Sequence, residues 1–178
     1  GTLQQNGCGK YEDFTYETLR RLKSLGVTHI WFTGVIRHAT RTRFESCGIG
    51  ANHPDIVKGE AGSPYAITDY FDVAPSLAND PTNRMKEFEE LLIRCKNLSL
   101  KVIIDFVPNH LSREYNPVNA NRERPCFGEN DKRDYHFHPM NNYYYLPGTS
   151  FIPPVKSDNT EPYTENPARV TGNDCFRP

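Results

Sequence analysis

Hydrophobic and polar positions in the first part of the chain alternate in a way that predicts a helix followed by a strand. Three leucines recur at helical spacing, namely Leu19, Leu22 and Leu25. Gly26 comes next and is the residue type that most often ends a helix. Residues 27–33 are β-branched and aromatic, which is typical of a short buried strand. The pattern therefore predicts a helix that turns directly into a strand.

A second helix and strand follow. After Pro81, apolar residues recur at i, i+3, i+7 and i+10, namely Met85, Phe88, Leu92 and Cys95. Residues 101–107 then form an almost continuous apolar run that Pro108 ends, as in a parallel strand covered on both faces. Both helix-to-strand turns are short, and the strand-to-helix connection, residues 34 to about 82, is long. This is the organisation of βα folds, in which functional sites lie at the carboxyl ends of the strands.

Residues 111–178 have a different composition. They hold nine of the 14 prolines and six of the ten tyrosines, and they show neither a helical nor a strand period. A stretch of this length without regular elements is too long for an ordinary loop. We therefore predict a small irregular subdomain or a binding loop.

Composition and charge exclude some function classes. The chain has 178 residues with 21 Lys+Arg and 22 Asp+Glu, a net charge of −1, which argues against a nucleic-acid-binding protein. No apolar run approaches the ~20 residues that cross a membrane. The first residues resemble the interior of a longer protein, so the cellular compartment stays open. The five cysteines are scattered without a C-x-x-C pair, and we interpret them as structural thiols, with a disulfide in an exported protein as the alternative.

The sharpest chemical feature is the sequence Asp-x-x-x-Asn-His at the end of the second predicted strand. Asp105 lies in the apolar run, where an ionised carboxylate is costly unless it is hydrogen-bonded. Asn109 and His110 follow at the carboxyl end of the strand, where an α/β fold places its site. The spacing alone fits a functional cluster as well as it fits a structural Asp that binds loop amides. By contrast, we interpret the basic residues of the preceding long connection as a solvated loop: Arg37, Arg41 and Arg43.

At these residues the chain resembles the α-amylase family of glycoside hydrolases. The segment 105–110 is similar to the first conserved region of that family. Residues 26–32, 63–73 and 88–105 also resemble its helix 1 to strand 2, the segment before helix 2, and helix 2 running into strand 3. The resemblance covers residues 10–112 well and matches the remainder only by its place in the chain.

The resemblance implies an α/β fold, part of a (β/α)8 TIM barrel with an irregular inserted subdomain. Residues 1–110 would supply about two β/α units, and residues 111–178 most of the subdomain that follows strand 3. Open sheet edges in such a piece would favour self-association.

Site residues follow from the same resemblance. Tyr65 matches a tyrosine that stacks on the sugar where cleavage occurs, and His110 matches a histidine that donates to a hydroxyl of that sugar. Asp105 matches an aspartate that supports the catalytic groups without being the nucleophile. Asn109 matches a calcium ligand of the family. The sequence itself, apart from the resemblance, offers the Asp174 carboxylate as a second candidate calcium ligand.

The function implied is hydrolysis, with retention, of α-1,4-glucosidic bonds in starch or maltooligosaccharides, with an α-glucan as the partner. Ala66 replaces an acidic residue found in many members that trim chain ends, which favours an open cleft. The nucleophile, general acid and transition-state-stabilising carboxylates of the family follow later strands, so we expect these residues alone to be inactive. A transglycosidase and a non-catalytic carbohydrate-binding protein remain as alternatives.

Overall fold

The computed structural model describes residues 8–118, 125–154 and 161–170, and the chain forms two compact units. The first unit consists of residues 1–52 and 57–119, and the second of residues 53–56 and 120–178. Both helices and four of the strands that the structure describes belong to the first unit. Neither helix has the length and hydrophobicity needed to cross a membrane.

The first helix, α2 (Tyr16–Ser24), forms where the leucine pattern predicts one. Thr15 caps it, because the Thr15 hydroxyl accepts a hydrogen bond from the backbone N–H of Thr18 at 3.2 Å. Gly26 follows the helix with a φ of 89°, the left-handed conformation that glycine adopts without steric cost. The predicted helix and its glycine stop are confirmed.

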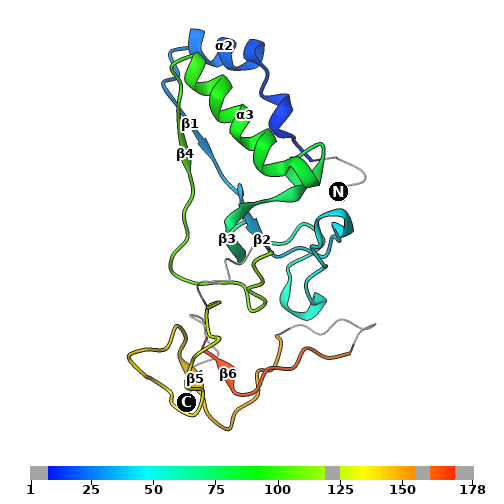
Figure 1. The fold of residues 1–178 in the computed structure, drawn as a ribbon, viewed down its shortest axis with the longest axis vertical. Helices are drawn as coiled ribbons and strands as arrows, with labels where there is room; N and C mark the ends of the chain where they lie inside the picture. Colours follow the sequence, from blue (N-terminus) through cyan, green and yellow to red (C-terminus); the bar gives the residue numbers. More distant parts are fainter. Residues whose placement is uncertain (1–7, 119–124, 155–160, 171–178) are drawn as a thin grey trace. The chain divides into compact units, whose positions relative to one another are not determined.

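Two predicted strands pair in parallel (Figure 1). Strands β1 (His29–Phe32) and β4 (Lys101–Ile104) align with His29 opposite Lys101 and Phe32 opposite Ile104. The prediction that the second strand reaches residue 107 is wrong, because the ladder ends with one bond from the Asp105 N–H to the Phe32 carbonyl at 3.4 Å. Asp105 therefore lies just beyond the strand and is only half-buried.

The second helix, α3 (Arg84–Asn97), lies beside α2 and follows the short 3₁₀ turn η5 (Pro81–Asn83). Its apolar stripe is displaced from the predicted one, since Met85 is 39% exposed and Leu91 is fully buried. The buried face also holds Glu87, whose carboxylate accepts the backbone N–H groups of Asn79 and Asp80, each at 2.8 Å. The core of the unit comprises Tyr11, Leu19, Val35, Val73, Ala78, Phe88, Leu91, Cys95 and Leu100.

The long connection between β1 and α3 contains an unpredicted antiparallel pair. Strand β2 (Ile36–His38) pairs with β3 (Ile67–Val73) in an irregular register. Strand β3 escaped the sequence analysis because it buries consecutive residues and includes two buried aspartates, Asp69 and Asp72. Its hydrophobic pattern therefore lacks the alternation that identifies a half-buried strand.

One face of the β1–β4 pair carries exposed apolar side chains. Trp31 is 65% exposed and Ile103 is 45% exposed, whereas Ile30 and Val102 pack against the helical core. The sequence of β4 is typical of a strand covered on both faces, and within the described residues this face is uncovered. Self-association through these strands remains a prediction.

The second unit contains only two short strands within its described residues. Strand β5 (Tyr145–Leu146) pairs antiparallel with β6 (Ala168–Arg169). The remainder consists of turns that side chains tie to the backbone. Asp131, for example, accepts the backbone N–H of Asn142 at 2.8 Å and of Tyr143 at 3.0 Å.

Candidate functional site

The carboxyl ends of β1 and β4 lie side by side at the same end of the pair, because the two strands are parallel. At this end the indole N–H of Trp31 donates a hydrogen bond to Oδ1 of Asp105 at 2.8 Å. The second oxygen, Oδ2, accepts no hydrogen bond from the described residues. This bond fixes the orientation of Asp105 and leaves one carboxylate oxygen available to a substrate or a further catalytic group.

Tyr70, in the middle of β3, holds the segment that carries Asn109 and His110. Its hydroxyl donates to the backbone carbonyl of Val107 and also lies 3.5 Å from the carbonyl oxygen of His110. The Tyr70 ring contacts Phe106, with ring centroids 5.4 Å apart. Burial raises the pKa of Tyr70, so its hydroxyl keeps its proton and remains a donor. Tyr70 thus joins β3 to the chain that leaves β4.

His110 and Asn109 are both exposed and lie side by side. The Asn109 carboxamide nitrogen lies 3.4 Å from Nδ1 of His110. His110 therefore presents an exposed imidazole, next to the Asn109 carboxamide, at the end of the parallel strands. An imidazole ring has two nitrogens that can take part in hydrogen bonds to a ligand.

Tyr65 lies on the segment that leads into β3, five residues before Tyr70. Its side chain is 47% exposed and makes no hydrogen bond to the described residues, while its backbone N–H donates to the Ser63 hydroxyl at 3.4 Å. No hydrogen bond joins Tyr65 to His110. The structure thus brings Asp105, Asn109 and His110 together on one segment, and links Tyr65 to that segment only through β3.

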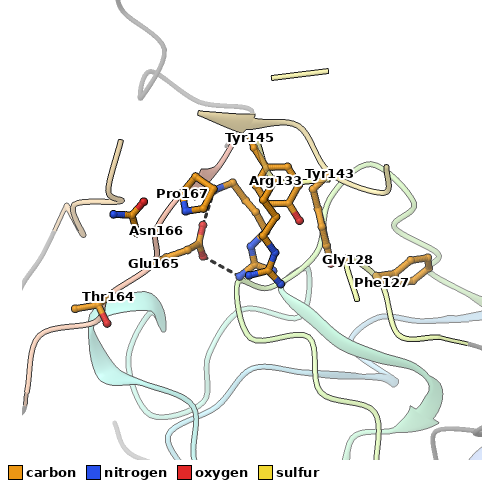
Figure 2. Close-up of a pocket in the computed structure, with 10 residues that line it drawn as sticks. Phe127, Gly128, Arg133, Tyr143, Tyr145, Thr164, Glu165, Asn166 and Pro167 are labelled. Atoms are coloured by element: carbon orange, nitrogen blue, oxygen red, sulfur yellow. Dashed lines mark hydrogen bonds and ion pairs between the residues drawn. The ribbon is translucent and has the colours of Figure 1, made fainter. Parts of the chain in front are cut away.

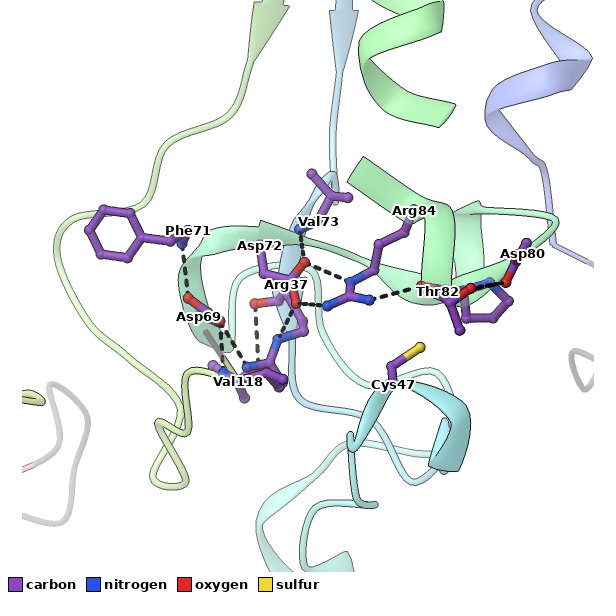
Figure 3. Close-up of polar contacts among 12 residues, drawn as sticks. Arg37, Cys47, Asp69, Phe71, Asp72, Val73, Asp80, Thr82, Arg84 and Val118 are labelled. Atoms are coloured by element: carbon purple, nitrogen blue, oxygen red, sulfur yellow. Dashed lines mark hydrogen bonds and ion pairs between the residues drawn. The ribbon is translucent and has the colours of Figure 1, made fainter. Parts of the chain in front are cut away.

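A buried ion network fixes β3 (Figure 3). Asp72 receives Arg84 through two bonds, Nε to Oδ1 at 2.7 Å and Nη2 to Oδ2 at 2.9 Å. Arg37 lies between both strand aspartates, with Nη2 at 3.1 Å from Asp69 Oδ2 and Nε at 3.2 Å from Asp72 Oδ2. Hydrogen bonding to Asp72 raises the pKa of Arg84. The interpretation of Arg37 as a solvated loop residue is wrong, since it is 5% exposed.

The same network anchors the chain beyond His110. Arg37 also donates to the backbone carbonyl of Asn116, and Asp69 Oδ2 accepts the backbone N–H of Val118 at 3.2 Å. Two backbone bonds, from Ser112 to Ile67 and from Asn116 to Thr68, continue the attachment. The segment with Asn109 and His110 is therefore held before and after these residues.

Trp31, Tyr70 and Arg37 are the site-forming residues that sequence reasoning missed. Trp31 and Tyr70 each combine an aromatic body with one hydrogen-bond donor. This donor was the only signal in the sequence for either residue, and it does not indicate which residue accepts the hydrogen bond.

The described residues do not by themselves form a metal site. They contain no group of three or more His, Cys, Asp or Glu side chains that could hold an ion. Calcium takes six to eight oxygen ligands, and Asn109 can offer one. Asp174 lies outside the described residues. Calcium binding therefore stays a prediction.

Comparison with known proteins gives one family. The model of the alpha-amylase catalytic domain matches residues 5–162. The salivary alpha-glucosidase of Anopheles gambiae is 25% identical over 118 residues, which are 66% of this chain and 16% of that protein. Maltase A1 of Drosophila melanogaster is 28% identical over 109 residues, which are 61% of this chain and 14% of that protein.

Among solved structures, an alpha-amylase from Lactobacillus plantarum is similar, with a TM-score of 0.45 and 28% identity. The match covers 59% of this chain and 20% of that chain. The chain spans about one sixth of the length of the curated relatives named here.

Proposed function

The chain belongs to the alpha-amylase family, and from that membership we propose that the whole protein is a retaining glycoside hydrolase of α-1,4-linked glucans. Strands β1 and β4 are then the second and third strands of a (β/α)8 barrel. The names of the relatives, an alpha-glucosidase and a maltase, support a substrate with α-glucosidic bonds. Starch and maltooligosaccharides are the substrates we propose.

The observation that carries the proposal is that the exposed imidazole of His110 and the free oxygen of Asp105 lie on one segment. Asn109 contacts the His110 ring, and Trp31 occupies only one oxygen of Asp105. A donor and an acceptor on one segment suit a sugar, whose hydroxyl groups both accept and donate. The half-exposed ring of Tyr65 offers an apolar face to the C–H face of a pyranose.

Retention of configuration needs two carboxyl groups about 5–5.5 Å apart, one as nucleophile and one as acid and base. We assign neither role to a residue of this chain, and Asp105 acts in support. We therefore expect a polypeptide of these 178 residues to release no reducing sugar from starch. Turnover by the pure polypeptide that is lost in Asp105→Ala would mean that the catalytic residues have been misplaced.

The test uses the full-length protein and short maltooligosaccharides. His110→Ala removes a hydrogen bond to the sugar, and Tyr65→Ala removes ring stacking, so each lowers kcat/KM by about tenfold or more. Tyr65→Phe is the matched control, because it keeps the ring and should retain most of the activity. Wild-type kinetics for the Ala variants at unchanged stability would remove those residues from the site.

Product analysis separates the alternatives. Sugar products of increased length would indicate a transglycosidase, and glucan binding without turnover would indicate a carbohydrate-binding protein. The proposed open cleft, which rests on Ala66, predicts that internal bonds of amylose are cut. Release of glucose alone from chain ends would contradict it.

Calcium binding is a further part of the proposal, with Asn109 as one ligand. Its carboxamide oxygen is the ligand type that calcium prefers. The thermal midpoint of the full-length protein should rise with calcium concentration, because only the folded state offers an assembled site. Asn109→Ala should abolish that rise. Identical melting curves in calcium and in chelator would contradict calcium binding.

A further inference from the structure

The second unit contains a pocket that shares no residue with the candidate site. Its volume is about 310 Å³, within the range of small-molecule sites. Two stretches of the second unit, residues 127–145 and 164–169, line it. Figure 2 shows Glu165 and Asn166 on one side of the pocket and Phe127 on the other.

One wall of the pocket is a close-packed stack. Gly128 has a φ of 82°, and a Cβ at this position would come within 2.6 Å of the Tyr143 ring. Arg169 covers the same ring, with Cζ 5.1 Å from the ring centroid. Glu165 holds Arg169 through a 2.8 Å ion pair with Nη2. Only a glycine allows this approach of backbone and ring, so the wall is formed before any ligand arrives.

The charges in and behind the pocket balance. Arg133 and Arg169 line it together with Glu165, and Asp131 lies behind the wall, where it accepts the Tyr145 hydroxyl at 3.0 Å. Burial lowers the pKa of Arg169, but the hydrogen bond and charge of Glu165 outweigh this and raise it, so Arg169 stays charged. Two cations and two carboxylates favour an uncharged polar ligand over an anion.

Further residues of the lining suit a sugar. Phe127 is 44% exposed, Arg133 is exposed, and Arg133 makes no hydrogen bond to the described residues. Thr164 and Asn166 add a hydroxyl and a carboxamide. An apolar ring beside neutral and charged hydrogen-bonding groups matches a pyranose, which has an apolar C–H face and polar edges.

We propose that this pocket binds a neutral saccharide, in the context of the proposed glycosidase one or two units of an α-glucan, at a site separate from the cleavage site. The identity of the sugar rests on the proposed function. The pocket does not, since its walls and charges are properties of the second unit alone.

The experiment measures hydrogen–deuterium exchange of the full-length protein with thio-linked maltotriose, which resists hydrolysis. We expect slower exchange in residues 125–145 and 161–170 on binding. Phe127→Ala and Arg133→Ala should each raise the maltotriose concentration that gives half of the full protection by about tenfold. Phe137→Ala is the control, because Phe137 is equally aromatic, 59% exposed and outside the pocket.

The outcomes separate this site from the proposed function. No protection in a protein that hydrolyses maltooligosaccharides would overturn the pocket proposal alone. Protection in a protein without turnover would support the pocket and overturn the proposed function. Two other results would also overturn the assignment of a saccharide to this pocket. One is slower exchange with inorganic phosphate instead of the sugar, and the other is a loss of protection in Phe137→Ala as large as in the pocket variants.

Discussion

The first unit packs apolar side chains of two helices against strands, whereas the described residues of the second form two strands of two residues each and bury few apolar side chains. In the second unit carboxylates and amides hold the backbone. The Asp131 carboxylate accepts hydrogen bonds from three donors. The Asn141 carboxamide makes two hydrogen bonds to the backbone of Lys132: its oxygen accepts from the N–H at 2.8 Å, and its nitrogen donates to the carbonyl at 2.9 Å.

The two units differ in what their charged side chains stabilise. In the first unit, the buried charges of β3 and α3 lie beside an apolar core cluster that does not include them. In the second unit, the charges replace the core, because turns of this length leave backbone groups that helices and sheets would otherwise satisfy. Substitutions of single aspartates in each unit test this distinction.

The largest effect is expected for Asp72→Ala in the first unit. It leaves both Arg37 and Arg84 buried without this carboxylate, and breaking a buried ion pair costs about 3–5 kcal/mol. Urea unfolding measures the loss. Glu17→Ala is the contrast, since Glu17 pairs with Arg21 at the surface at 2.6 Å and should cost at most about 1 kcal/mol. Equal losses in the two variants would refute the claim that burial gives the network its importance.

A smaller effect, confined to the second unit, is expected for Asp131→Ala. Burial and the hydrogen bond to Asp131 raise the pKa of Tyr145 to about 12, so Tyr145 donates at neutral pH. Removal of the carboxylate leaves that hydroxyl and two backbone N–H groups without this acceptor, at about 3 kcal/mol. Hydrogen exchange of the amides of Asn142 and Tyr143 should accelerate, while helix α3 stays protected.

Asp134→Ala serves as the control for this variant. Asp134 is exposed and makes no hydrogen bond to the described residues. If Asp131→Ala also accelerated exchange in α3, the claim that the two units are stabilised by different interactions would be wrong.

The same difference explains how much of the fold the sequence predicts. Helix α2, with its Gly26 stop, has periodic apolar residues, and strands β1 and β4 lie in short runs of apolar residues, so these elements were predicted. Strand β3 was missed because Asp69 and Asp72 break its pattern, and their neutralising arginines lie far away in sequence. Arg37 looked like a surface residue for the same reason. A partner distant in sequence leaves no local signal.

The candidate site follows the same rule. The segment from Asp105 to His110 was identified because it directly follows an apolar strand. Its supports come from elsewhere in the chain: Trp31 from the neighbouring strand and Tyr70 from β3. The roles of Tyr65, His110 and Asn109 came from the family resemblance and remain predictions until the variants above are measured.

The smallest effect concerns pH and the first unit. Burial lowers the pKa of His38 below its usual value of 6.5, while hydrogen bonds to the backbone of Ile36 and Ala61 oppose the shift. As pH falls through about 6.5, the unfolded chain takes up a proton that the folded chain does not, so stability falls. The loss ends once the pH is below the folded pKa as well. Urea midpoints between pH 7 and pH 5 should therefore decrease for the wild type and decrease less for His38→Gln. His29→Gln, at an exposed position on β1, should retain the wild-type slope, and an unchanged slope in His38→Gln would exclude His38 as its source.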